Sequence, residues 1–187
     1  FEMHSCEDGD YTIIYKGSRG VILEVNGLAE LHQKLGELKS EGVEAIAFPH
    51  HIAYHRGQRG INWDSYTEEF SPIVEIISMH GCSEADENTR PFLHVMGPSD
   101  HESTMQYGLA QGNFFGVIGS TDHHSAHPGS YGHGRTGLWA RKKTREDIWD
   151  ALTSRRTYAL TGDRIELQFS INGQPMGAQL SAAEERN

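Results

Sequence analysis

Phe114-Phe-Gly-Val-Ile-Gly-Ser-Thr-Asp-His-His124 is the stretch of the chain that says most about its fold. An apolar run, typical of a buried strand, leads within a few residues into an acid and two imidazoles. Two earlier segments repeat this order: residues 43–48 precede the His50-His51 pair, and residues 73–77 precede His80. Functional side chains gather at the carboxyl ends of strands in α/β sheets and barrels, so the repetition indicates an α/β fold.

The N-terminal segments fit the same class. Residues 11–15 and 21–25 are β-rich runs joined by a Gly-Ser-Arg-Gly turn, which predicts a hairpin. Asn26 is a suitable N-cap for the helix that follows, because leucines recur at helical spacing up to residue 38. Gly42 ends this helix, and the next strand begins directly after it.

The C-terminal part of the chain adds one more helix and then β structure. Residues 144–152 carry a capping-box pattern at the start of a helix. Polar and apolar residues alternate over residues 164–171, which predicts a strand. The Asn172-Gly173 pair that follows is a hairpin turn signal. We therefore expect part of an α/β barrel over residues 1–162 and a small β-rich extension with a loose tail over residues 163–187.

Composition excludes several classes of protein. The 187 residues include 16 Lys and Arg against 26 Asp and Glu, which gives a formal net charge of −10. This balance argues against binding to nucleic acid or to anionic lipid, both of which need clustered basic side chains. No apolar run is long enough to span a bilayer, and no signal peptide is recognisable. We expect a soluble protein with a small-molecule substrate, in either the cytoplasm or the periplasm, and the oligomeric state stays open.

Histidine is the residue type that points to chemistry, with 12 copies against only two cysteines. Imidazole nitrogen and carboxylate oxygen are the ligands of zinc, manganese and iron in hydrolase sites. Asp122 and His124 are two residues apart, which places both side chains on one face of an extended strand tip. Glu75, within a strand, and His80, at its end, are further candidates, and a purely structural role is the alternative for both.

Six segments, which together extend over nearly the whole chain, resemble those of a known family. They are Phe48-Pro-His-His51, residues 74–84, residues 117–129, Gly137-Leu-Trp-Ala140, residues 144–162 and Asn172-Gly-Gln-Pro-Met-Gly177. These segments look like the C-terminal half of PHP-type metallohydrolases, and they are most similar to the DUF3604 and CehA/McbA-like groups. The resemblance implies a distorted (β/α)₇ barrel that holds two or three divalent metal ions at its C-terminal mouth.

The positions that match the family's motifs supply the expected metal ligands. Asp122 would also orient or deprotonate the attacking water. The family's His-x-His ligand pair lies upstream of the position of Glu2 and is not in this chain, so we expect an N-terminal part of the domain to precede Phe1. The chain as it stands would then bind fewer ions, or none. The expected ligands are Glu2, His50, His80, Asp122 and His124.

The resemblance further implies a hydrolase in which a divalent metal ion activates water, with zinc as the expected ion and manganese or iron as alternatives. A phosphoester is the expected substrate, and His51, Arg59 and Arg135 would hold its anionic group. Two alternatives stay open: hydrolysis of a carboxylic ester, carbamate or amide, and a truncated, non-catalytic metal-binding module. Asp122-His-His124 also spells the signature of DHH phosphoesterases, but the residues after it match the PHP-type pattern instead.

Overall fold

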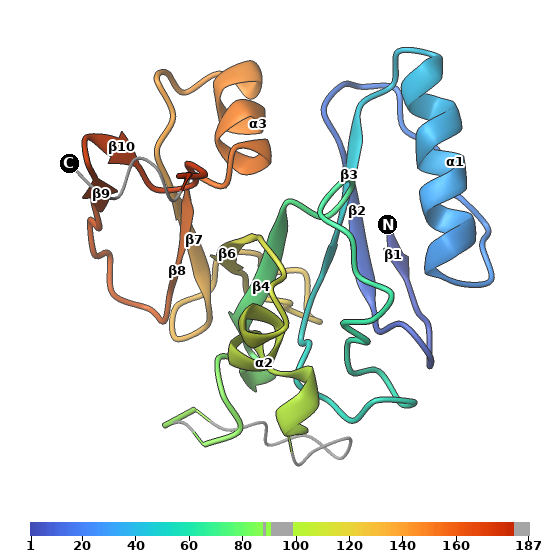
Figure 1. The fold of residues 1–187 in the computed structure, drawn as a ribbon, viewed down its shortest axis with the longest axis horizontal. Helices are drawn as coiled ribbons and strands as arrows, with labels where there is room; N and C mark the ends of the chain where they lie inside the picture. The colour runs from blue at the N-terminus through green and yellow to red at the C-terminus, as the bar shows by residue number, and fades with distance from the viewer. Residues whose placement is uncertain (88, 91–98, 182–187) are drawn as a thin grey trace.

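The computed structural model describes residues 1–87, 89–90 and 99–181 of the chain. Within this part, short strands are distributed over four small sheets and three α-helices lie at the periphery (Figure 1). In chain order the elements are β1 (Glu2–Met3), β2 (Tyr11–Tyr15), α1 (Leu28–Ser40), β3 (Ala45–Pro49), β4 (Ile73–Ser78), β5 (Gly81–Cys82), the 3₁₀ helix η1 (His101–Ser103), α2 (Met105–Ala110), β6 (Gly116–Gly119), β7 (Arg135–Leu138), α3 (Arg145–Thr153), β8 (Thr157–Leu160), β9 (Ser170–Ile171) and β10 (Gln174–Pro175).

The N-terminal sheet has the order β1-β2-β3 and is antiparallel throughout. Tyr11 at the start of β2 lies opposite Pro49 at the end of β3, so these two strand ends meet at one edge. Helix α1 covers one face of the sheet (Figure 1), and Leu28, Leu31 and Leu35 pack against its apolar side chains. The leucines whose spacing predicts the helix are therefore also the side chains that pack it against the sheet.

The start of α1 differs from the prediction. Asn26 does not cap the helix, because its side chain donates to Glu30 at 2.9 Å. The carboxylate of Asp8, from the loop before β2, instead accepts a hydrogen bond from the backbone N–H of Leu28 at 3.0 Å. Residues 21–25 form no strand, since β2 already pairs with β1 on one edge and with β3 on the other.

The central sheet is built on β4, all six residues of which are buried. Its nearly continuous apolar sequence is typical of a strand covered on both faces, and Glu75 is the charged exception. Strand β4 pairs in parallel with β6 and antiparallel with the short β5. Because β4 and β6 are parallel, the residues that follow them enter the same region of the molecule, as the sequence predicts.

The expected distorted (β/α)₇ barrel is wrong for this chain. The described residues form sheets of three, two, three and two strands, and these do not close into a barrel. A strand–helix–strand order favours a parallel βαβ unit. Here residues 16–27 run back along the N-terminal sheet before α1 begins, so β3 enters antiparallel to β2 (Figure 1). Among the described strands, only β4 and β6 pair in parallel.

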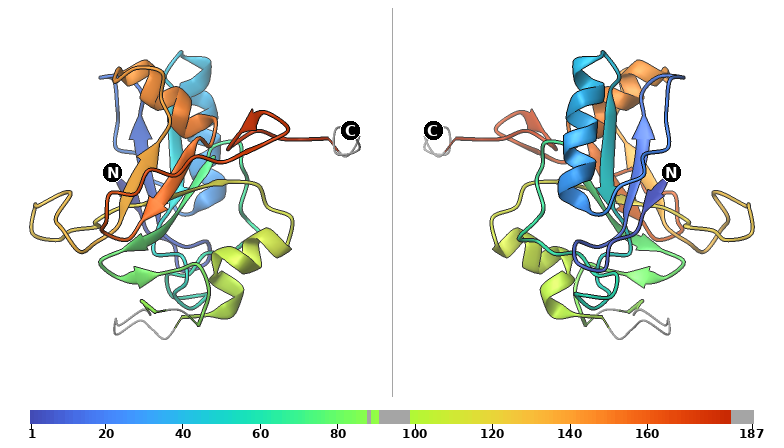
Figure 2. Two further views of the ribbon diagram at one scale, coloured as in Figure 1. Left: turned by 90° about the vertical axis from the view of Figure 1, so that its left-hand side faces the viewer. Right: turned by 90° about the vertical axis from the view of Figure 1, so that its right-hand side faces the viewer.

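The C-terminal elements pack beside β6. Strands β7 and β8 form an antiparallel pair, and Thr144 caps α3 by accepting a hydrogen bond from the backbone N–H of Asp147 at 3.2 Å, as predicted. The Asn172-Gly173 turn has positive φ at both residues and joins β9 to β10, which confirms the hairpin. The strand expected over residues 164–171 is shorter, Ser170–Ile171. Figure 2 shows the hairpin extending away from the other elements, and residues 182–187 of the expected tail lie outside the described residues.

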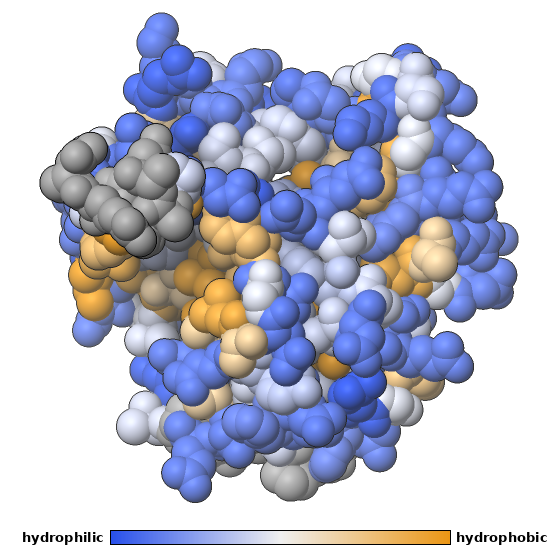
Figure 3. Space-filling model, viewed as in Figure 1, coloured by the Kyte–Doolittle hydropathy of each residue, from blue (hydrophilic) through white to orange (hydrophobic). Residues whose placement is uncertain are grey.

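Apolar side chains reach the surface on the side of the C-terminal strands, where Figure 3 shows an area of hydrophobic residues. Along the segment that leads into β9, and in β9 itself, the alternate residues Ile165, Leu167, Phe169 and Ile171 are exposed. None of the described helices is both long enough and apolar enough to cross a membrane.

Candidate metal centre

Two groups of side chains in the structure have the composition and spacing of metal ligands. The first cluster consists of Glu2, Asp10, His50 and His51, and the second cluster consists of His80, Asp122 and His124. In each cluster, one possible ligand atom from every residue lies within 4.8 Å of all the others. The structure therefore brings together all five predicted ligands and adds Asp10 and His51.

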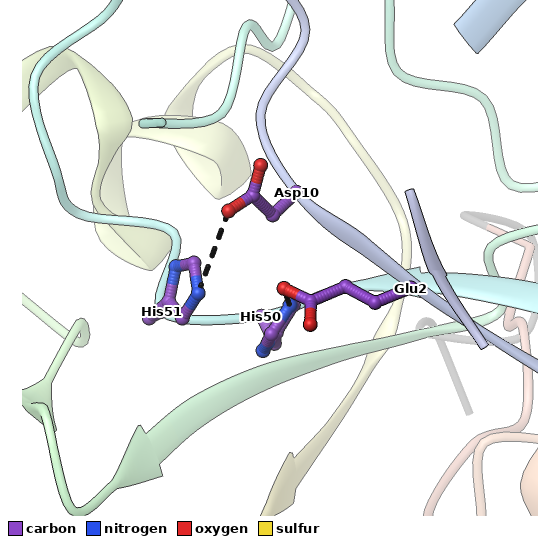
Figure 4. Close-up of side chains that lie close together, drawn as sticks. All are labelled: Glu2, Asp10, His50 and His51. Carbon is purple, nitrogen blue, oxygen red and sulfur yellow. Dashed lines mark hydrogen bonds and ion pairs between the residues drawn. The ribbon is translucent and has the colours of Figure 1, made fainter. Parts of the chain in front are cut away.

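Four strands position all of these residues except Asp10. Glu2 belongs to β1, and the two histidines of the first cluster directly follow β3 (Figure 4). His80 comes two residues after β4, and Asp122 comes three residues after β6. Because β4 and β6 are parallel neighbours, their following loops deliver His80 and Asp122 to the same place.

The first cluster consists of two acid–imidazole pairs side by side (Figure 4). His50 Nε2 lies 2.9 Å from Glu2 Oε1, and His51 Nε2 lies 3.6 Å from Asp10 Oδ2. Both histidines and Asp10 are buried, whereas the side chain of Glu2 is 35% exposed. The cluster is thus a buried acid–imidazole group that Glu2 connects to solvent.

Asp10 is the member of the site that the sequence analysis missed. It directly precedes β2, and the antiparallel pairing of β2 with β3 places it beside the end of β3. The backbone N–H of His50 donates to the carbonyl of Asp10 at 3.2 Å, which fixes this arrangement. The only sequence signal for Asp10 is its place immediately before a predicted strand. That place indicates a role in the site only once the pairing of β2 with β3 is known.

The second cluster is a triangle of two imidazoles and one carboxylate. His80 Nε2 is 3.0 Å from Asp122 Oδ2 and 3.4 Å from His124 Nε2, and His124 Nε2 is 3.6 Å from Asp122 Oδ1. His80 is buried, Asp122 is partly buried, and the His124 side chain is 66% exposed. One side of the triangle therefore opens to solvent, where a small molecule can approach.

The charges of the two clusters are coupled. Burial alone would lower the pKa of His50, but the carboxylates of Asp122 and Glu2 outweigh burial and raise that pKa to about 10. Burial, with the neighbouring cations His50 and Arg59, lowers the pKa of His51 to about 2. Burial opposes ionisation of Asp122, yet His50 and His80 hold its pKa well below the usual range. At neutral pH the metal-free site thus combines a charged His50, a neutral His51 and an ionised Asp122.

Glu75, in the middle of β4, connects the loops that carry the two clusters. Its carboxylate accepts a hydrogen bond from the backbone N–H of His51 at 3.4 Å and a second one from the hydroxyl of Ser120. Burial raises the pKa of this fully enclosed side chain. Of the two roles that the sequence leaves open for Glu75, these contacts fit the structural one.

Two site residues have strained backbone conformations. His51 and Asp122 have positive φ angles, 36° and 45°, a region that non-glycine residues seldom adopt. Each such residue costs of order 1–3 kcal/mol and persists only where the surrounding structure enforces it. Both lie at the first turn after a strand, so this strain is located where the ligand side chains leave the sheets.

The donor set fits a divalent transition metal. Two ligands bound tetrahedrally at about 2.1 Å from one zinc ion lie about 3.4 Å apart. In the second cluster each imidazole faces a different oxygen of Asp122, and the separations of 3.0, 3.4 and 3.6 Å lie close to this spacing. In the first cluster, His51 Nδ1 is buried without a hydrogen-bond partner in the described part of the chain. A buried unsatisfied nitrogen is unusual for a purely structural histidine.

The three residues expected to hold a substrate lie in different surroundings. His51 belongs to the first cluster, and Arg59 reaches into that cluster from the loop after β3. Arg135 points elsewhere, because its guanidinium donates to the carbonyl of Gly162 at 2.7 Å and lies 4.4 Å above the Tyr131 ring. The geometry therefore associates Arg59, but not Arg135, with the clusters.

The C-terminal part of the chain matches a family model. Residues 130–186 match the model described as "Protein of unknown function (DUF3604)", one of the two groups that the sequence resembles. This segment includes β7, α3, β8 and the β9–β10 hairpin, and it begins after the last residue of the second cluster. The match thus supports the DUF3604 resemblance for the C-terminal segment.

Three chlamydial proteins, each described as an "Uncharacterized protein", resemble a larger part of the chain. Those of Chlamydia trachomatis serovar D and Chlamydia muridarum are each 31% identical over 156 residues, which cover 78% of this chain and 25% of the relative. A protein of Chlamydia pneumoniae is 30% identical over 138 residues, which cover 68% and 22%. The chain spans about a quarter of the length of these relatives. No solved structure matches it.

Proposed function

We propose that this chain carries the metal centre of a divalent-metal-dependent hydrolase, with a phosphoester as the substrate class. The observation that carries the proposal is the triangle of the second cluster, in which two imidazole nitrogens and a carboxylate have the mutual spacing of ligands to one ion. The resemblance to PHP-type metallohydrolases supports the same function. Zinc is the preferred ion, because imidazole and carboxylate suit it well, with manganese and iron as alternatives.

The protein's own residues have distinct roles in this proposal. A divalent ion, when bound, supplies Lewis-acid activation of water and of the substrate oxygen. His80, Asp122 and His124 would hold one ion, and the first cluster contains the residues for another. Asp122 is a weak base because its pKa is held so low, so it would bind the ion and orient water rather than accept a proton.

Access for the substrate is provided at the exposed members of the site. The side chains of His124 and Glu2 are 66% and 35% exposed, while His50, His51 and His80 line the buried side. A small molecule can therefore approach from the side of His124 and Glu2. The buried histidines keep the opposite side free of bulk water, which strengthens electrostatic interactions within the site.

Metal content tests the proposal first. Plasma mass spectrometry should find at least one equivalent of zinc, manganese or iron in the chain, and should find it lost in Asp122→Asn/His124→Gln. Asparagine is chosen because it tolerates the positive φ of position 122. His123→Gln/His127→Gln is the matched control, since it removes two histidines of the same loop that belong to neither cluster. Metal retained by the first variant would contradict the proposed centre.

Turnover assays then separate the substrate classes. Metal-dependent hydrolysis of 4-nitrophenyl phosphate, absent in Asp122→Asn/His124→Gln, is the expected result. Hydrolysis of naphthyl acetate without hydrolysis of the phosphoester would assign the chain to the carbon-ester alternative. Bound metal without turnover of either substrate would identify a metal-binding module.

A further inference from the structure

Arg59 places its guanidinium inside the first cluster. Its Nε donates to Asp10 Oδ2, and its Nη2 lies 3.4 Å from Glu2 Oε1. The same Nη2 is 3.4 Å from His51 Nε2 and 3.2 Å from His4 Nδ1. One guanidinium group thus contacts three of the four residues of this cluster.

These contacts use the atoms that a metal ion would need. Asp10 Oδ2 and His51 Nε2 are the two atoms of one acid–imidazole pair of the cluster, and Glu2 Oε1 belongs to the other. A guanidinium has only donors and keeps its charge throughout the accessible pH range. It therefore neutralises these carboxylates as a cation does, and it repels a second cation at the same place.

In the part of the chain that the structure describes, Asp122 of the second cluster is paired with the imidazoles of His50, His80 and His124 and with no arginine or lysine. The two clusters thus differ in what already occupies them. Imidazole nitrogen is itself a metal ligand, whereas a guanidinium has only donors and must move away before an ion can bind.

We propose that Arg59 is an internal cation that occupies the first cluster in the metal-free protein, so that the second cluster binds an ion first. The first cluster binds its own ion only when the Arg59 side chain swings out, which its position on a surface loop and its 30% exposure permit. The inference rests on the proposed metal centre and adds the order in which the centre is filled.

Zinc titration of Arg59 variants tests the order of filling. Calorimetry with plasma mass spectrometry should give one tight equivalent for the unchanged chain and two for Arg59→Met, which keeps the apolar stem but removes the charge. The dissociation constant of the first cluster should fall at least tenfold. Arg59→Lys should behave like the unchanged chain, because it keeps the charge. Arg56→Met is the control: Arg56 lies on the same loop but pairs with Asp64 and Glu102 instead.

Each possible result either supports or overturns the proposed order of filling. Equal stoichiometry and affinity in the unchanged chain and Arg59→Met would overturn the inference, as would two tight equivalents in the unchanged chain. If Asp122→Asn/His124→Gln loses the single zinc equivalent of the unchanged chain, the proposed metal centre is still supported. The metal centre and the order of filling can therefore fail separately. If Arg59→Met folds poorly because Asp10 loses the guanidinium of Arg59, thermal melts provide the test. Zinc should raise the Tm of Arg59→Met more than the Tm of the unchanged chain, and an equal rise would overturn the inference.

Discussion

His50 connects Glu2 of the first cluster to Asp122 of the second. Its Nε2 is 2.9 Å from Glu2 Oε1, and its Nδ1, on the other side of the ring, is 3.7 Å from Asp122 Oδ2. The side chain is only 5% exposed, so the imidazole is confined between the two carboxylates. His50 of the first cluster is therefore in direct contact with a carboxylate of the second cluster.

Replacing His50 should weaken the second cluster although His50 is not one of its three members. We expect His50→Gln to reduce zinc affinity there about tenfold, the lower end of the effect of removing a group that orients a metal ligand. Competition with a chromophoric chelator measures the change. His55→Gln is the control, because His55 lies on the same loop as His50 but is exposed and pairs with Asp100. Unchanged affinity in His50→Gln would show that the two clusters act independently.

Replacing Glu75 should loosen the connection between the loops after β3 and β6. In Glu75→Leu, the N–H of His51 and the hydroxyl of Ser120 lose their acceptor, which costs about 1–3 kcal/mol of unfolding free energy. Glu75→Gln keeps an acceptor and should lose about half as much. Urea denaturation measures both. A leucine variant as stable as the unchanged chain would mean that the two loops hold their positions without Glu75.

Zinc affinity should increase with pH. Because the pKa of His50 is raised to about 10, this imidazole is protonated at neutral pH and must release its proton before its nitrogen can bind a metal. His51, with a pKa of about 2, and the ionised Asp122 have no proton to release. In Arg59→Met, whose first cluster is open to an ion, we expect up to about a tenfold gain in affinity per pH unit between pH 6 and 9 for an ion bound through His50. Calorimetry in buffers of different ionisation enthalpy should detect the released proton, and His50→Gln should abolish it.

The raised pKa of His50 also affects the stability of the metal-free protein. A folded-state pKa above the unfolded value means that the folded form binds the proton more tightly. The stabilisation is fully present below the unfolded pKa of about 6.5 and is lost as the pH rises toward about 10. Denaturation of chelator-treated protein at pH 6 and pH 9 should show this loss, and His50→Gln should reduce it.

Gly60 should be intolerant of any side chain. A Cβ at this position would lie 1.7 Å from the backbone oxygen of Tyr54, so the loop that carries Arg59 would have to move. We expect Gly60→Ala to lower the unfolding free energy by about 1–3 kcal/mol. Gly36→Ala in α1 should have the opposite sign and stabilise by about 1 kcal/mol, since its Cβ would only reach ordinary contact with Phe70. Thermal melts of both variants test the contrast.

The sequence predicts individual elements of this fold better than their arrangement. The leucine spacing of α1, the apolar run of β4 and the Asn172-Gly173 turn depend on local physics, and all three are confirmed. Strand direction is not a local property. The return of residues 16–27 along the sheet makes β2 and β3 antiparallel, and nothing in their composition distinguishes this from a parallel crossover.

The same limit applies to the site. His50, His80 and Asp122 stand where apolar strands end, so their convergence follows from the predicted strands. Asp10 joins them through antiparallel pairing, which the sequence does not reveal. Arg59 was predicted to be near the site as a group for substrate, but its partners are the carboxylates of Asp10 and Glu2. Counter-ions within a site become visible only with three-dimensional structure.

The positive φ angles of His51 and Asp122 have a consequence for substitution. Glycine at either position would remove the cost of the positive φ, but it would also remove an imidazole or a carboxylate from the centre. At position 122 it would in addition leave the charged, buried His50 without one of its two carboxylate partners. The strained backbone at position 122 therefore accompanies a side chain that the charge balance of the site requires.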